Sequence, residues 1–166
     1  MSQTFSLTPH ETVTVREHSP DALVVEGRWG PGGSAPPPHL HPGQDERFEV
    51  LEGELTALVD GAQHTLGPGA VLEVPRGAVH KMWNSGGGET RALWRTSPAG
   101  RTLDWFEALD GLGRRHPPGR AGMPSPTRLA ALLSEYDDVI RIAAGPRALV
   151  GPVLAGLAAV GRRQGP

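Results

Sequence analysis

The chain has 166 residues and a formal net charge of −2 at pH 7, so we expect one domain with appended elements. It contains no cysteine, which excludes disulfides and thiolate metal sites, and no run of Lys or Arg, which argues against a nucleic-acid partner. Its 23 glycines and 17 prolines favour many short strands joined by tight turns.

The N-terminal residues carry charged side chains early and have no apolar core segment, so they do not resemble a secretory signal. We therefore expect residence in the cytoplasm.

From residue 11 onwards, short β-type segments follow one another. Residues 11–17 alternate polar and β-branched side chains and fit an edge strand. Pro36, Pro37 and Pro38 enforce an extended approach to His39. Asp60-Gly61 is a strong hairpin signal. The remaining predicted strands are residues 22–29, 48–59 with a break at 52–53, 63–66, 71–74, 79–83 and 91–96.

The pattern changes after Ser97-Pro98, where helical periodicity replaces alternation. Residues 103–109 predict a short helix, and residues 114–126 a linker rich in Pro and Gly. Ser125-Pro126 is a typical helix start, and apolar side chains recur at helical spacing from Leu129 to Ile140. Residues 147–160 predict a second, mostly apolar helix. At about fourteen residues it is too short for a membrane span of roughly twenty, so we expect no membrane contact.

Two motifs carry the chemistry of this sequence. In the first, Gly33 is followed by His39, His41, Glu46 and Gly53. In the second, Gly69 is followed by Pro75, Gly77, His80 and Asn84. His39 and His41 are two residues apart, so in an extended strand both rings point to the same face. Imidazole and carboxylate are ligands that intermediate divalent metals accept, which indicates a metal centre.

The sequence resembles the cupin superfamily, whose motifs are G-x5-H-x-H-x3,4-E-x6-G and G-x5-P-x-G-x2-H-x3-N. It matches every fixed position of both, and fifteen residues separate Gly53 from Gly69, as in compact bacterial cupins. The resemblance implies a mostly β fold, the double-stranded β-helix or jelly-roll barrel, with α-helices at the C-terminus. We expect residues 1–98 to form the barrel, and residues 99–166 to form a helical extension packed on it or at a dimer interface.

The resemblance also implies the ligands of one divalent transition metal per chain: His39, His41, Glu46 and His80. Iron is the first expectation, and manganese, nickel, zinc or copper are alternatives. Three imidazoles and one carboxylate leave two coordination positions for a substrate. Asn84 is expected to fix a turn rather than to take part in chemistry.

Alternation along the strands predicts which side chains line the cavity beside the metal: Trp29, Phe48, Val50, Met82 and Trp94. This set makes a mostly apolar pocket. No acid–base residue beyond the ligands is identified in it, and no catalytic residue beyond the ligands is predicted.

Three functions are compatible with these features, because cupins include enzymes and binding proteins. The first is a metal-dependent, dioxygenase-type oxidoreductase that acts on a small, largely apolar organic molecule. The second is a non-catalytic cupin that binds or senses a small ligand. The third is an isomerase or lyase that uses the metal as a Lewis acid, which a second acid–base residue in the cavity would favour. Apolar residues of the last predicted helix, if uncovered, favour a homodimer.

Overall fold

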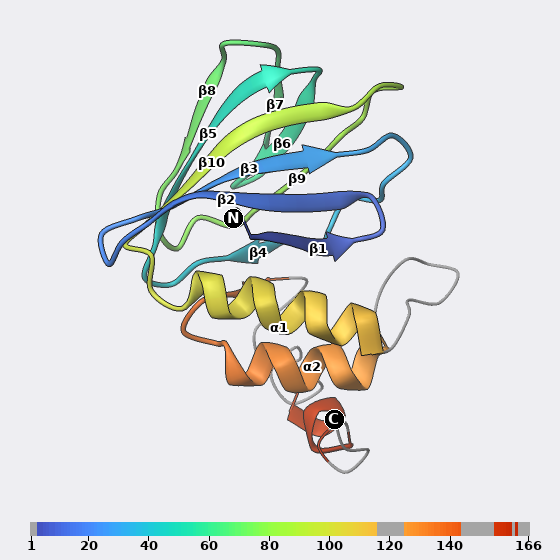
Figure 1. Ribbon diagram of the computed structural model, residues 1–166. Coiled ribbons are helices and arrows are strands. Elements are labelled where there is room, and N and C mark those ends of the chain that lie inside the picture. The colour runs from blue at the N-terminus through green and yellow to red at the C-terminus, as the bar shows by residue number, and fades with distance from the viewer. Residues whose placement is uncertain (1–2, 116–124, 144–154, 161, 163–166) are drawn as a thin grey trace.

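The computed structural model describes residues 3–115, 125–143, 155–160 and 162. Figure 1 shows two β-sheets that face each other, with helices gathered along one side of them. One sheet contains, in spatial order, β1 (Thr4–Thr8), β2 (Glu11–His18), β3 (Leu23–Trp29), β10 (Thr90–Ser97), β5 (Asp45–Glu52) and β8 (Val71–Val74). The other contains β11 (Arg141–Ile142), β4 (His39–Leu40), β9 (His80–Trp83), β6 (Leu55–Val59) and β7 (Ala62–Leu66). The predicted mostly β jelly-roll fold with C-terminal helices is confirmed.

The turns have the residues that their backbone geometry requires. Asp60 and Gly61 both have positive φ, 46° and 86°, and connect β6 to β7 as the two-residue hairpin predicted from the sequence. Gly53 has φ 76°, and a Cβ there would lie 2.5 Å from the carbonyl oxygen of Glu89. Asn84 fixes a turn as expected: its amide donates to the carbonyls of Trp29 and Gly88.

The prediction that residues 11–17 form an edge strand is wrong, because β1 covers that edge. Thr4, Phe5 and Ser6 pair antiparallel with residues of β2, and β2 pairs with β3 on its other side. Phe5 is buried at the same time, so the N-terminal segment gains apolar contacts as well as backbone hydrogen bonds. The five residues of β1 form a pattern too short to be recognised from the sequence.

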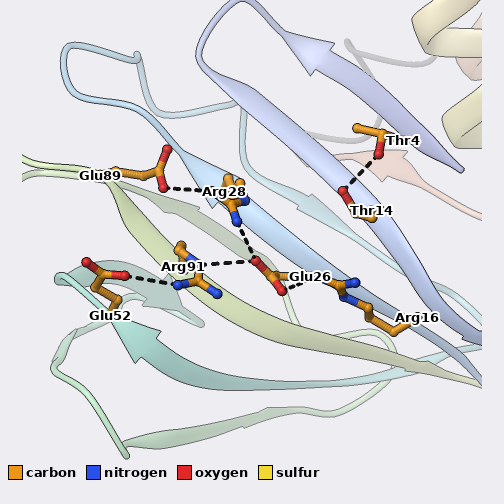
Figure 2. A network of polar contacts seen from close by, with 8 residues as sticks. All are labelled: Thr4, Thr14, Arg16, Glu26, Arg28, Glu52, Glu89 and Arg91. Atoms are coloured by element: carbon orange, nitrogen blue, oxygen red, sulfur yellow. Dashed lines mark hydrogen bonds and ion pairs between the residues drawn. The ribbon is translucent and has the colours of Figure 1, made fainter. Parts of the chain in front are cut away.

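The outer face of the larger sheet carries a network of charges around Glu26 (Figure 2). Its carboxylate accepts hydrogen bonds from Arg16, Arg28 and Arg91, although only 5% of the residue is exposed. The hydrogen bond from Arg16, opposed by burial and supported by Arg91, lowers the pKa of Glu26. These arginines come from three adjacent strands, so the network holds β2, β3 and β10 together.

The helices pack against β1 and the open side of the barrel (Figure 1). The predicted helix at 103–109 is longer than expected, because α1 spans Thr102–Arg115 and includes the start of the predicted linker. In α2 (Pro126–Glu135), the hydroxyl of Ser125 accepts from the backbone N–H of Arg128, as the predicted N-cap requires. Apolar residues of α1, α2, β1, β2 and β3 form one core cluster, and the barrel interior forms another.

The two helices predicted for the C-terminal region, at residues 129–140 and 147–160, differ in how far the structure agrees with them. The helical pattern from Leu129 to Ile140 ends early, because the chain leaves α2 at Glu135 and turns to pair as β11 with β4. Of the predicted helix at 147–160, residues 155–160 are helical, and residues 147–154 lie outside the described part. No helix among the described residues is both long and apolar enough to cross a membrane.

Candidate metal centre

Three histidines come together where β4 and β9 lie side by side. His39 of β4 is the cross-strand partner of His80 of β9, and His41 follows two residues after His39. One ring nitrogen from each histidine lies within 4.8 Å of those of the other two, and this group could hold a metal ion. The chain segments that supply the histidines are about forty residues apart in sequence, so the sheet pairing assembles the cluster.

Each imidazole is oriented by a backbone carbonyl that accepts a hydrogen bond from its Nδ1. The distances from Nδ1 are 2.9 Å to Pro37 for His39, 2.6 Å to Val139 for His41, and 3.1 Å to Ala78 for His80. A carbonyl can only accept, so Nδ1 carries the proton. In the neutral ring, the lone pair is then on Nε2 and available to a metal.

The carboxylate of Glu46 faces two of these nitrogens. Its Oε2 lies 2.9 Å from Nε2 of His80, and its Oε1 lies 3.3 Å from Nε2 of His41. With Nδ1 protonated, neutral rings present lone pairs to the carboxylate lone pairs, which is why Nε2 of His41 and Oε2 of Glu46 lack a hydrogen-bond partner among the described residues. Such a group of lone pairs requires a cation between them, either a proton on an imidazole or a metal ion.

The spacing of these donor atoms fits a metal ion. Ligand atoms in adjacent positions of an octahedral ion, with bonds of about 2.1 Å, lie about 3 Å apart. The separation of 2.9 Å between Glu46 and His80 agrees with this value. The chemistry of the donor set, neutral imidazole and carboxylate without thiolate, suits iron, manganese, nickel, copper or zinc.

The electrostatics of the cluster favour an ionised Glu46 beside a His80 ring that binds a proton more readily than a free imidazole. Burial acts to raise the pKa of Glu46, but the neighbouring imidazoles of His41, His80 and His39 lower it to about 2. Burial acts to lower the pKa of His80, but the adjoining Glu46 carboxylate raises it above 6.5. Burial and the charges of His80 and His41 lower the pKa of His39 to about 4, so His39 is neutral at pH 7.

The indole of Trp94 supports the carboxylate from the adjacent strand. Its Nε1 donates to Oε1 of Glu46 at 2.9 Å, and its ring stacks on Phe48 with a centroid distance of 5.3 Å. The sequence predicted Trp94 only as a cavity wall. The structure gives Trp94 a second role, because its indole fixes the orientation of the buried Glu46 carboxylate.

The C-terminal extension also forms part of this centre. The carbonyl of Val139, which orients His41, lies 98 residues further along the chain. Arg141 and Ile142 then pair with Leu40 and His39, and the N–H of Ala143 donates to the carbonyl of Pro38. The strand β4, which contains His39 and directly precedes His41, is therefore held between β9 and the extension.

A further contact joins the loop between His41 and Glu46 to the start of α1. The side-chain amide of Gln44 donates to the carbonyls of Pro98 and Ala99 and to the hydroxyl of Thr102, and 4% of the residue is exposed. The position of α1 is thus coupled to the loop that separates two members of the cluster.

The histidine cluster opens into a cavity of about 900 Å³ between the barrel and the helices. Trp29, Phe48, Met82 and Trp94 line it, as the sequence analysis expected. Val50 does not: it has the predicted inward orientation, but it lies four residues beyond Glu46 on β5, about 13 Å along the strand. It is 1% exposed within the barrel core.

The helical extension supplies a wall that strand alternation could not predict. Side chains of α1, α2 and the segment after α2 line the cavity: Trp105, Phe106, Leu109, Leu129, Leu133 and Ile140. They are apolar, so the part of the cavity remote from the cluster is well suited to an apolar ligand.

The cavity also contains a carboxyl group that the sequence analysis did not identify. Glu11, the first residue of β2, lines the cavity together with Trp29. Burial raises the pKa of Glu11 to about 7, although a hydrogen bond from the Trp29 side chain acts in the opposite direction. The expectation of no acid–base group beyond the cluster is therefore wrong. Its signal was present in the sequence, because Glu11 has the same strand parity as Val13 and Val15.

Comparison with known proteins agrees with the fold and the motifs. The family model for the cupin domain matches residues 25–95. A solved RmlC-like cupin from Shewanella frigidimarina superposes with a TM-score of 0.55 at 18% identity, over 62% of this chain and 89% of that one. This chain therefore contains a cupin domain.

Curated relatives share the cupin segment but are much longer proteins. An oxidoreductase of Arthrobotrys oligospora is 35% identical over 80 residues, which is 47% of this chain and 29% of that protein. Quercetin 2,3-dioxygenase of Bacillus subtilis is 34% identical over 71 residues, which is 43% of this chain and 21% of that protein. The chain thus spans less than a third of the length of these two relatives.

Proposed function

We propose that this protein is a metal-dependent cupin enzyme, a dioxygenase-type oxidoreductase that acts on a small, largely apolar organic molecule. The observation that carries the proposal is the cluster of three imidazoles with Nδ1 on backbone carbonyls, together with the Glu46 carboxylate that lies beside Nε2 of His41 and of His80. We assign His39, His41, Glu46 and His80 as the ligands of one divalent transition metal.

When bound, an ion such as iron(II) supplies Lewis acidity and, through its redox activity, access to reaction with dioxygen. The residues of the chain perform the remaining tasks. Trp94 holds Glu46 in place through its indole N–H, and the Val139 carbonyl keeps Nε2 of His41 available. Phe48, Trp105 and the other apolar side chains of the wall bind the body of the substrate and exclude water.

The likeness of the cupin segment to two proteins named as an oxidoreductase and a quercetin dioxygenase supports this reaction class. A planar hydroxyketone fits the cavity in chemical terms: two adjacent oxygens suit a metal, and the aromatic body suits the apolar wall. We therefore propose aromatic hydroxyketones, diketones and phenols as the first compounds to test.

The test uses the full chain loaded anaerobically with iron(II) and incubated with 3-hydroxyflavone, acetylacetone or catechol, with and without air. The expected result is oxygen uptake and an oxygenated product for at least one compound, lost in His80→Ala. Recovery of every compound unchanged in air, with iron(II) bound, would contradict the dioxygenase. Tight binding of an unchanged compound in that experiment would instead identify a non-catalytic binding or sensor protein.

Glu11 specifically favours a second candidate, a Lewis-acid isomerase or lyase. Such a reaction needs a group that removes and returns a proton, and a cavity carboxyl with a pKa of about 7 is suited to that role at neutral pH. Exchange of solvent deuterium into a carbonyl compound, without oxygen uptake and dependent on metal, would distinguish this reaction from the first.

A further inference from the structure

The side chain of Glu11 is directed into the barrel by the register of its strand. Glu11 is the cross-strand partner of Trp29, and it shares its face of β2 with Val13, which is fully buried. Alternate residues of a strand share a face, so the Glu11 carboxyl points toward the cavity that both residues line.

Trp29 and Gly27 shape the environment of this carboxyl. A Cβ at Gly27 would lie 2.4 Å from Cη2 of the Trp29 indole, so the ring occupies the space that a side chain at position 27 would need. The indole is the side-chain hydrogen-bond partner of Glu11. Its single N–H satisfies one acceptor position of the carboxylate and leaves the others for a ligand.

Glu11 and the three histidines line the same cavity, so one ligand can contact both. Glu11 also lines a recess together with Trp29 and Met82, and Met82 follows His80 by two residues on β9. Two residues along a strand correspond to about 7 Å, so Met82 connects this recess to the cluster along β9. The wall of the same cavity includes the aromatic side chains of Phe48 and Trp94.

The other charged groups at the cavity, outside the cluster, are less suited to bind a ligand. Among the described residues these are His10, which is exposed, and Lys81, whose Nζ lies 5.3 Å from the centroid of the Trp83 ring. Glu11, by contrast, is partly withdrawn from solvent, and its pKa of about 7 allows it both to accept and to donate a hydrogen bond at neutral pH.

We propose that Glu11 forms a second polar anchor in the cavity, where it hydrogen-bonds a hydroxyl group on the part of an aromatic ligand remote from its metal-binding oxygens. The inference rests on the proposed function in that both place the ligand in the same cavity. It narrows the ligand class to hydroxylated aromatic compounds, because a purely apolar compound would shield the carboxyl from water without replacing the hydrogen bonds that it loses.

The test compares 2-naphthol with 2-methylnaphthalene, which have similar shapes and differ in one hydroxyl group. Dissociation constants are measured by equilibrium dialysis on the full chain, both with chelator and after loading with manganese(II). Neither compound carries a chelating oxygen pair, so the comparison reports on Glu11 separately from the metal. The quantity of interest is the ratio of the two affinities, because this ratio cancels changes that affect both compounds equally.

We expect Glu11→Met to lower the affinity ratio of naphthol to methylnaphthalene about three- to tenfold, the loss of one hydrogen bond. Glu11→Gln keeps an acceptor oxygen and should lower the ratio less, and this variant is the better test if Glu11→Met folds poorly. Glu17→Gln is the matched control, because Glu17 is an exposed residue of the same strand and should leave the ratio unchanged.

An unchanged ratio in folded Glu11→Met, or in Glu11→Gln if that is the only folded variant, would overturn the inference. Failure of both compounds to bind the wild-type protein would overturn it as well. The expected change in ratio, in a protein that binds no metal, would support the Glu11 anchor and contradict the proposed metal centre alone.

Discussion

Replacement of Trp94 by Phe tests whether the indole supports the metal centre or only lines the cavity. The change retains an aromatic ring beside Phe48 and Phe106, whose centroids lie 5.3 Å and 5.2 Å from that of Trp94. It removes the N–H that donates to Oε1 of Glu46 at 2.9 Å. The carboxylate is 2% exposed, so water does not readily replace that donor.

The expected magnitude follows from the charge of the acceptor. A hydrogen bond to a charged group contributes about 1.5–3 kcal/mol, and the loss of part of the indole surface adds roughly 1 kcal/mol. We therefore expect the metal-free Trp94→Phe protein to lose about 2.5–4 kcal/mol in free energy of unfolding at pH 7. Because Glu46 is also less well oriented, metal affinity should fall about 10- to 100-fold.

The stability change is measured by urea denaturation in the presence of chelator, followed by far-UV circular dichroism, and the affinity by competition with a metal indicator. Trp105→Phe is the matched control, because Trp105 lines the same cavity and contacts Tyr136, with no hydrogen bond to the cluster among the described residues. If Trp94→Phe changed metal affinity no more than Trp105→Phe does, the supporting role of the indole would be refuted.

Four further predictions address the cluster, its extension and the assembly. His41→Ala should lower metal affinity on the order of 100-fold or more while circular dichroism shows a folded barrel. The control variant His64→Ala should leave metal affinity unchanged. Because the pKa of His80 is raised, metal affinity should continue to increase with pH above 6.5, as measured by competition titration. Ala143→Pro removes the donor that pairs the extension with the strand before His39, and should weaken metal binding about tenfold in the same titration. The protein should be a homodimer by light scattering at micromolar concentration, since the large apolar side chains of Leu51, Val71 and Val160 are exposed.

The pH prediction has a definite sign for stability as well. A raised pKa of His80 stabilises the metal-free fold below pH 6.5, and this contribution is lost as the pH rises through the folded pKa. The lowered pKa values of His39 and Glu46 make the stability rise with pH instead. Their effect is confined to pH values below 6.5 for His39 and below 4.5 for Glu46. The contribution of the cluster to stability should therefore fall above pH 6.5 without metal and rise with metal. Parallel trends in the two forms would contradict the proton assignment.

The other three predictions have equally direct contrary results. Full metal occupancy in His41→Ala would remove that residue from the ligand set. Unchanged metal affinity in a folded Ala143→Pro protein would show that the extension does not support the centre. A monomeric mass would count against pairing.

The sequence by itself determined the features that depend on neighbouring residues. Strand alternation and turn residues predicted nearly all the strands of the barrel, because backbone geometry at Asp60-Gly61 or the prolines before His39 is a local property. The two motifs predicted that His39, His41 and His80 would meet, and the spacing of Trp29, Phe48, Met82 and Trp94 predicted that they would line one cavity.

Only the tertiary structure decided which distant groups complete the site. The carbonyl of Val139 reaches His41 across 98 residues, and no periodicity in the sequence relates the two. Strand parity placed Val50 on the correct face but could not give its depth, and the same parity at Glu11 gained meaning only once β2 was seen to face the helices across the cavity. Alternation reports the face on which a side chain lies, whereas a binding site depends on how far along that face it lies and on which segments close over it.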